Sequence, residues 1–196
     1  MPASESPGGP FAAEPHRERP DSPPRSYGVP RSGGRFVEWA HVIERLDRAE
    51  AYWLATVTPD GRPHAVPIWG VLVGAELYLE TGAPETIKNR NLARNPAVEV
   101  HLDGVNDAVI VRGTAAPVRP KRSLETRLIR AFHAKYPGYE PERGGWDHGG
   151  LIRVVPSTVL AWTEMPTATR WRWVSEERSS PSTRPSRQRP ARPSAS

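Results

Sequence analysis

The middle of the chain consists of short runs of β-branched and aromatic residues separated by turn-forming residues. Residues 54–58 and 63–69 are such runs, and the stretch 59–62 between them reads Pro-Asp-Gly-Arg, which is typical of a hairpin turn. A second break, Gly-Ala at 74–75, precedes a further run that ends at residue 81. The pattern predicts an antiparallel meander over this part of the chain.

The rest of the chain adds strands and amphipathic helices. Residues 97–103 alternate, with Val98 and Val100 on one face and Glu99 and His101 on the other, which is typical of a half-buried strand. Other strands are predicted at residues 108–118, 151–163 and 169–174, and helices at residues 36–49, between Pro84 and Asn95, and at residues 120–134. We therefore expect a mainly β fold with flanking helices.

The two ends differ in composition from the middle. Residues 1–34 are rich in proline, serine and glycine, and residues 175–196 combine arginine with proline and serine, so both lack the apolar surface that folding requires. We expect two disordered tails around one domain at residues 35–174.

An arm is the alternative for the first segment. Its few apolar residues, Phe11, Tyr27 and Val29, are the anchors with which it would wrap a partner subunit.

The positive charge of the chain is concentrated in the second tail. Five arginines less two glutamates give residues 175–196 a charge of +3, out of +5 for the whole chain, so the pI near 10.0 owes most to this tail. This distribution indicates no more than weak, nonspecific attraction to nucleic acid or anionic membrane.

Missing residue types exclude several kinds of site. The chain has no cysteine, which rules out disulfides, thiolate metal sites and cysteine nucleophiles. Asp147 and His148 are adjacent but lack further ligands at a suitable spacing, so no metal site is expected.

With no apolar run of about 18 residues and no signal-peptide core, we expect a cytoplasmic protein that does not associate with membranes.

One stretch has residue types that suit an anionic ligand. Pro84 fits the first turn of a helix, and Thr86, Lys88 and Arg90 follow within its first two turns. Free N–H groups, a hydroxyl and two cations make a plausible phosphate site. The alternative is a solvated basic face, and the spacing alone does not decide between the two.

The order of these pieces resembles the flavin-binding split β-barrel superfamily, which includes pyridoxamine 5′-phosphate oxidases (PNPOx) and deazaflavin (F420)-dependent reductases. The matching strand residues are Leu-Ala-Thr-Val at 54–57, Asp-Gly-Arg-Pro at 60–63, Val-Pro-Ile-Trp at 66–69 and Leu-Tyr-Leu at 77–79. Thr-Ile-Lys-Asn-Arg-Asn-Leu at 86–92, followed by Asn-Pro at 95–96, is similar to the Ser/Thr-x-Lys-x-x-Asn-Leu element of these proteins. The resemblance covers roughly residues 39–173 and implies a six- to seven-stranded antiparallel split β-barrel.

At two positions this sequence differs from the pyridoxamine 5′-phosphate oxidases, and both differences favour the F420 branch. Pyridoxamine 5′-phosphate oxidases carry an Arg and, five residues later, a Lys that reach the flavin phosphate, whereas this chain has Val66 and Val71. In the resembled F420-dependent reductases the phosphate contacts concentrate on the Lys/Arg helix. The resemblance therefore implies an F420-dependent reductase rather than a pyridoxamine 5′-phosphate oxidase.

The resemblance implies a homodimeric oxidoreductase that transfers hydride between F420 and a small conjugated substrate, in a groove completed by the second subunit. The cofactor-binding residues that it implies are Ala65, Val66, Pro67, Ile68 and Trp69 along the ring, Thr81, Thr86, Lys88 and Arg90 at the phosphate, Asn91 fixing the helix, and Arg170 and Trp171 near the cofactor. No catalytic acid, base or nucleophile is expected, because hydride transfer can proceed without one.

Other functions stay open at this point. An FMN-binding oxidoreductase of the same fold and a cofactor-free binding module are the alternatives. The alternation of arginine and tryptophan in residues 169–174 also suits nucleic-acid binding, which we place second because no specific nucleic-acid partner is indicated. Residues 136–150, rich in glycine and proline, are a candidate lid in which Tyr139, Trp146 and His148 would line a substrate opening.

Overall fold

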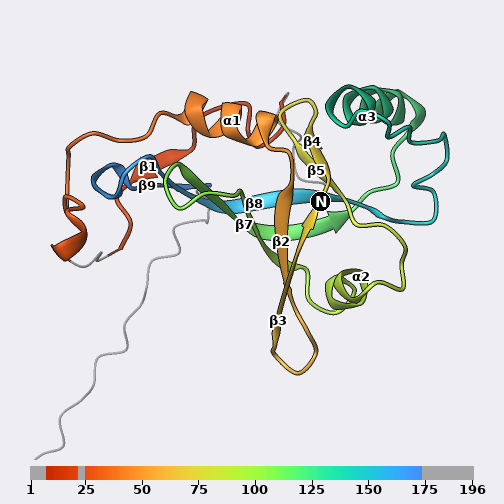
Figure 1. Cartoon of the computed structure of the whole chain (residues 1–196), viewed down its shortest axis with the longest axis horizontal. Helices are drawn as coiled ribbons and strands as arrows, with labels where there is room; N and C mark the ends of the chain where they lie inside the picture. Colours follow the sequence, from red (N-terminus) through yellow and green to blue (C-terminus); the bar gives the residue numbers. More distant parts are fainter. Residues whose placement is uncertain (1–7, 22–24, 174–196) are drawn as a thin grey trace, which may run out of the picture.

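The computed structural model describes residues 8–21 and 25–173, and over these residues the chain is a mainly antiparallel sheet with three α-helices (Figure 1). The strands are β1 (His16–Glu18), β2 (Tyr52–Val57), β3 (Pro63–Ile68), β4 (Gly70–Leu72), β5 (Leu77–Glu80), β6 (Ala97–His101), β7 (Ala108–Pro117), β8 (Leu151–Trp162) and β9 (Thr169–Arg172). The helices are α1 (Trp39–Arg48), α2 (Ile87–Leu92) and α3 (Arg122–Lys135), with short 3-10 turns at Arg25–Tyr27 and Met165–Thr167. The predicted mainly β fold with flanking helices is confirmed.

The sheet is organised around β8, the longest strand. Its neighbours follow the order β1-β9-β8-β7-β6-β2-β3, and β5 joins the same strand while also pairing with β4. Residues 151–154 of β8 pair with β5, whereas residues 158–161 pair with β9. Pro156, which has no N–H to donate, lies between these two segments. One long strand thus joins two parts of the sheet.

The chain bends between β3 and β4 at Trp69. β3 pairs with β2, and β4 pairs with β5, but β3 and β4 do not pair with each other among the described strands. The sheet is therefore not closed by hydrogen bonds, and the chain itself crosses the gap. A Cβ on Gly70 would lie 2.9 Å from the Tyr78 carbonyl oxygen, a backbone atom that a side-chain rotation cannot move, so the tight path after the bend favours glycine.

Two apolar clusters lie against the sheet. The larger includes the inward face of α1, where Trp39, Val42 and Leu46 are buried as the helical pattern predicts. The smaller joins β4, β5, α3 and the segment that follows α3. In Figure 1, α1 and α3 lie on one side of the sheet and α2 lies on the other, while the β2–β3 hairpin projects from the body.

The structure corrects the prediction for the N-terminal segment. Residues 8–21 are not a disordered tail, because β1 pairs with β9 along the edge of the sheet and Phe11 is only 3% exposed. Phe11 packs on Trp39 and Trp173 of the same chain, while Tyr27 remains 54% exposed. An ordered arm thus packs on its own subunit. The predicted tail at residues 175–196 lies outside the described residues.

The described residues form nine strands, whereas six to seven were predicted. The arm supplies β1, and β4 follows the predicted run 63–69 as a separate strand after the bend at Trp69. The helix expected from Pro84 begins only at Ile87, with Thr86 as its N-cap. Within residues 8–21 and 25–173, no helix has both the length and the hydropathy needed to cross a membrane.

Candidate functional site

A cavity of about 380 Å³ opens where β3 and β5 end and the loop before α2 begins. Its lining residues are Ala51, Pro67, Ile68, Trp69, Glu80, Thr81, Gly82 and Lys88. The structure therefore brings together five of the residues proposed from the sequence: Pro67, Ile68, Trp69, Thr81 and Lys88.

The loop between β5 and α2 is held by the two asparagines of α2. Asn89 Nδ2 lies 2.8 to 3.3 Å from the carbonyl oxygens of Thr81, Gly82 and Ala83. Asn91, which is 3% exposed, donates to Thr56 Oγ1 at 3.0 Å and so ties the helix to β2. Asn91 thus ties α2 to β2, and Asn89 shapes the loop.

Thr81 and Lys88 in one wall of the cavity, and Thr86 outside its lining, have polar groups without protein partners among the described residues. The Thr81 side chain is 1% exposed, and its Oγ1 has no hydrogen-bond partner among the described residues. The buried Oγ1 of Thr86 is equally unpartnered in that part of the chain. Within residues 8–21 and 25–173, Lys88 forms no ion pair with a carboxylate. Buried polar atoms are normally satisfied, so this wall has the donors for an anionic ligand.

The other wall is aromatic. Trp69 is 45% exposed and stacks on Tyr136, with ring centroids 5.1 Å apart and planes 23° from parallel. The Tyr139 ring packs against the Trp69 ring, with the two ring centroids 4.8 Å apart. Trp69 is therefore held by neighbours and still offers surface to a ligand, which makes it a platform for a planar ring.

Glu80 lies at the aromatic wall and was not among the residues proposed from the sequence. Tyr139 Oη lies 2.5 Å from both Glu80 carboxylate oxygens and donates to the group. Burial raises the pKa of Glu80, although hydrogen bonds from Tyr139 and Trp146 partly oppose this shift. The only sequence signal was its place at the strand end, because Tyr139 reaches it from a loop 59 positions away.

Several other proposed residues lie outside the cavity lining. Ala65 is exposed on β3, and Arg90 is exposed on α2. Val66 packs partly against the larger apolar cluster, and Val71 is 2% exposed in the smaller one. Neither valine could present charge to the cavity, so any cation for an anion there comes from the α2 side.

The structure does not bring Arg170 and Trp171 to this cavity within one chain. Trp171 is fully buried in the larger apolar cluster. A cross-strand row runs from Pro67 on β3 through β2, β6, β7 and β8 to Arg170 on β9, five strand spacings or about 24 Å along the sheet.

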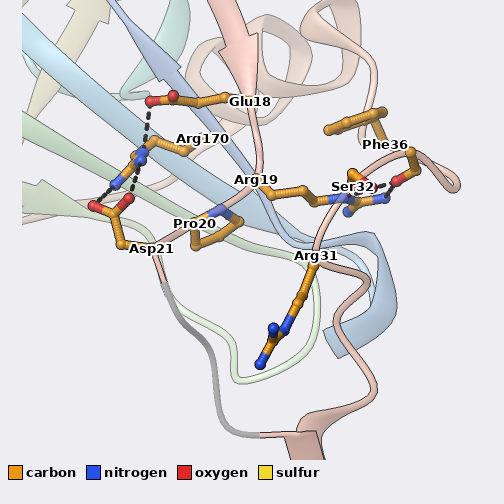
Figure 2. A pocket seen from close by; sticks show the side chains of 9 residues that line it. Glu18, Arg19, Pro20, Asp21, Arg31, Ser32, Phe36 and Arg170 are labelled. Carbon is orange, nitrogen blue, oxygen red and sulfur yellow. Dashed lines mark hydrogen bonds and ion pairs between the residues drawn. The ribbon is translucent and has the colours of Figure 1, made fainter.

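Arg170 instead lies at a second cavity of about 750 Å³ beneath the N-terminal arm (Figure 2). It donates to Glu18 at 2.8 Å and pairs with both oxygens of Asp21. These carboxylates raise the pKa of Arg170. Its side chain is thus already engaged by two carboxylates, and a role in cofactor binding remains a prediction.

The candidate lid residues have different environments. Tyr139 contacts the cavity wall through Trp69 and Glu80. Trp146 is 3% exposed and packs on Phe132, whereas His148 is exposed. Tyr139 and Trp146 thus contact Glu80, which lines the cavity, whereas His148 does not line it.

Comparison with known proteins identifies relatives by fold. The chain matches the Rv2991 conserved hypothetical protein of Mycobacterium tuberculosis at 22% identity and a TM-score of 0.56, over 69% of this chain and 90% of that one. An FAD-binding protein of Mesorhizobium loti matches at 18% identity and a TM-score of 0.50, over 69% and 96%. A protein described as an F420 reductase matches at 28% identity and a TM-score of 0.47, over 59% and 93%. No curated protein matches the chain.

The sequence itself matches one family. Residues 39–163 fit the family described as pyridoxamine 5′-phosphate oxidase, and this match covers well over half of the chain. It includes both walls of the cavity and confirms the resemblance seen in the strand and helix motifs. The chain therefore belongs to the pyridoxamine 5′-phosphate oxidase family.

Proposed function

We propose that this protein is an F420-dependent oxidoreductase that acts on a small conjugated substrate. The observation that carries the proposal is the pair of buried, unpartnered hydroxyls, Thr81 Oγ1 and Thr86 Oγ1, close in sequence to a lysine with no carboxylate partner in the described chain. Across the same cavity lies the exposed part of Trp69. Such a site suits a ligand with a phosphate at one end and a planar ring at the other.

The donors of this wall match the chemistry of a phosphate. Phosphate oxygens accept hydrogen bonds, and a hydroxyl or an ammonium group supplies the donors. Filling the site would satisfy two threonine hydroxyls that are otherwise buried without partners, which is worth more than adding bonds at an exposed surface. Thr81, Thr86 and Lys88 would hold the phosphate.

Trp69 would orient the ring, and Tyr136 and Tyr139 would keep Trp69 in place through their ring contacts. When bound, the deazaflavin would supply hydride transfer. The apolar side chains of Ile68 and Pro67 would exclude water from one side of the ring. No residue of this chain is assigned as an acid or base for the transfer.

F420 is favoured over FMN because of where the cations lie. Val66 and Val71 replace the Arg and Lys of the resembled oxidases, and both valines pack in apolar clusters. The cations for a phosphate would then come from the α2 side, as in the resembled F420-dependent reductases. FMN is the alternative cofactor.

A homodimer is part of the proposal. Trp53, Ile110 and Leu160 are partly exposed in one cross-strand row that starts at Pro67, a residue of the cavity lining. A second copy covering these three side chains, with His101 between Trp53 and Ile110 in the same row, would also border the cavity. Light scattering of the purified protein should give twice the mass of the 21.7 kDa chain. The mass of a single chain at micromolar concentration would exclude this part.

Fluorescence titration tests the cofactor. Oxidised F420 should bind at micromolar concentration, and FMN should bind far more weakly. Lys88→Ala should weaken F420 binding by about 1.5–3 kcal/mol, the range for hydrogen bonds to charged groups. The matched control is Lys121→Ala, because Lys121 is exposed at the start of α3.

Each outcome has a clear meaning. Preferential binding of FMN would move the protein to the alternative cofactor. Failure of both to bind would contradict the oxidoreductase proposal and favour a cofactor-free binding module. Equal effects of Lys88→Ala and Lys121→Ala would remove Lys88 from the site.

A further inference from the structure

Glu80 is a carboxyl group in the cavity wall, and no positive side chain of the described residues neutralises it. Within residues 8–21 and 25–173 it forms no ion pair, although Lys88 lines the same cavity. Glu76, the residue just before β5, carries a carboxylate that pairs with Arg153 at 2.6 Å. Burying part of a carboxylate without a cation costs free energy unless hydrogen-bond donors satisfy its oxygens. The donors to the Glu80 oxygens therefore have to be identified.

The alternation of β5 places this carboxyl opposite the phosphate-binding wall. Leu77 and Leu79 pack in the larger apolar cluster, whereas Tyr78 packs in the smaller one beside α3. Because successive side chains of a strand point to opposite faces, Glu80 shares the face of Tyr78, and Thr81 shares that of Leu79. The cavity therefore has its donors on one side and its acceptor on the other.

Tyr139 fixes this acceptor against the ring platform. Its hydroxyl lies 2.5 Å from both oxygens of Glu80, and its ring leans on Trp69 at 4.8 Å. The Glu80 backbone N–H also donates to the Trp69 carbonyl at 2.9 Å. An ionised carboxylate has about four acceptor positions, and the Tyr139 hydroxyl and the Trp146 indole N–H together fill only some of them.

We propose that Glu80 is a specificity-determining residue that accepts a hydrogen bond from an N–H group on the edge of the bound ring. The inference rests on the proposed function and extends it. Ligands stacked on Trp69 are selected by a donor at this edge, while ligands with only acceptors there are rejected. Both deazaflavin and flavin carry such a donor, the imide N–H at ring position 3.

Paired ligands test this assignment. Dissociation constants of F420 and of its analogue methylated at ring N3 are measured by fluorescence for the wild type and for Glu80→Gln. If the protein takes FMN instead, FMN and 3-methyl-FMN form the pair. The wild type should prefer the N–H ligand by at least about tenfold, the scale of a hydrogen bond to a charged group.

Glu80→Gln keeps the shape of the side chain but removes its charge. The preference for the N–H ligand should therefore fall by several-fold, mainly through weaker binding of that ligand. Glu76→Gln is the matched control, because Glu76 is engaged by Arg153 and Tyr78 and does not line this cavity. Its preference should equal that of the wild type.

The outcomes distinguish the role of Glu80 from the proposed function on which it rests. Lys88→Ala should weaken both ligands equally and leave their ratio unchanged. If the ratio of the two dissociation constants is unchanged in Glu80→Gln while the parent cofactor still binds, the role of Glu80 is wrong and the proposed function still stands. If the wild type binds neither F420 nor FMN, both the proposed function and this inference are wrong.

Discussion

The hydroxyl of Tyr136 makes both backbone hydrogen bonds of Gly70. It accepts from the Gly70 N–H at 3.0 Å and donates to the Gly70 carbonyl at 2.9 Å. Gly70 is the first residue after the bend, where the chain leaves β3 and enters β4. A side chain from the end of α3 thus replaces the neighbouring strand that a closed barrel would supply, and the ring of the same residue supports Trp69.

Tyr136→Phe should lower the free energy of unfolding by about 1–3 kcal/mol, because a buried N–H and a buried carbonyl lose their partner. Urea denaturation followed by tryptophan fluorescence measures the change. The stack of the ring on Trp69 is retained in this variant, so cofactor affinity should change by less than stability does. An unchanged unfolding free energy would mean that water satisfies Gly70 equally well.

Thr81→Val should separate binding from folding. The buried hydroxyl has no partner in the described chain, so the isosteric methyl group should leave stability unchanged or raise it by about 1 kcal/mol. F420 affinity should nevertheless fall about tenfold, because one phosphate donor is lost. Thermal unfolding and fluorescence titration give the two values.

Thr169→Val is the contrasting variant. Its hydroxyl is fully buried, accepts from the Val37 N–H at 2.9 Å and donates to the Thr167 carbonyl at 2.7 Å, far from the cavity. It should lose stability and keep its affinity for F420. The same pattern in both variants would show that Thr81 is only structural.

Stability should depend on Lys135 at alkaline pH. Burial lowers the pKa of its amine from 10.5 to about 8, and the amine donates to Tyr52 Oη at 2.8 Å. Above about pH 8 the unfolded chain therefore holds more protons at this position than the folded protein, and stability rises with pH. Urea denaturation between about pH 7 and pH 9.5 should show this rise in the wild type.

Lys135→Met should flatten that part of the pH profile, because the titrating group is gone. At pH 7, where the charged amine is least favourable, the variant should be at least as stable as the wild type. A parallel rise in both proteins would assign the pH dependence to other groups.

The N-terminal arm should depend on Arg19. This side chain is 8% exposed and donates to the carbonyls of Gly33, Arg35 and Ala168, which joins the arm to two distant loops. Arg19→Met should lower the free energy of unfolding by about 2–3 kcal/mol and speed proteolysis within the arm. Arg17→Met removes surface ion pairs with Glu14 and Glu38 and a cation–π contact with Phe36, and should change stability by no more than about 1 kcal/mol.

Local patterns were sufficient for the parts of the fold that depend on local chemistry. The apolar stripe of α1 predicted the burial of Trp39 and Leu46, and the Gly-Ala break at 74–75 predicted the turn before β5. The alternation of arginine and tryptophan in β9 placed Arg170 and Trp171 on opposite faces of the strand. These features depend on the period of the chain and on turn geometry, both of which can be read from neighbouring residues.

The arm could not be predicted in this way. β1 is only three residues long, without apolar alternation, and it is held by pairing with β9 and by Arg19. Its anchors come from residues about 150 positions away, and composition alone indicates disorder for such a segment. Tertiary contacts outweigh the low apolar content here.

The candidate site was predictable only in part, for the same reason. Thr81, Lys88 and Trp69 stand in recognisable strand and helix motifs, and the structure gathers them at one cavity. Glu80 gains its place only when Tyr139 folds back on it. Arg170 is held by Glu18 and Asp21, two residues of the arm that the composition had assigned to a tail.

The pairing of β1 with β9 also bears on how the protein is made. His16 pairs with Arg172, so the only neighbour of β1 in the described sheet is a strand that is translated about 150 residues later. At translation rates of about 5–20 residues per second, the arm waits on the order of ten seconds before that neighbour exists. Until then Phe11 has Trp39 but not Trp173 to pack against, so this part of the core is completed only after β9 has been made.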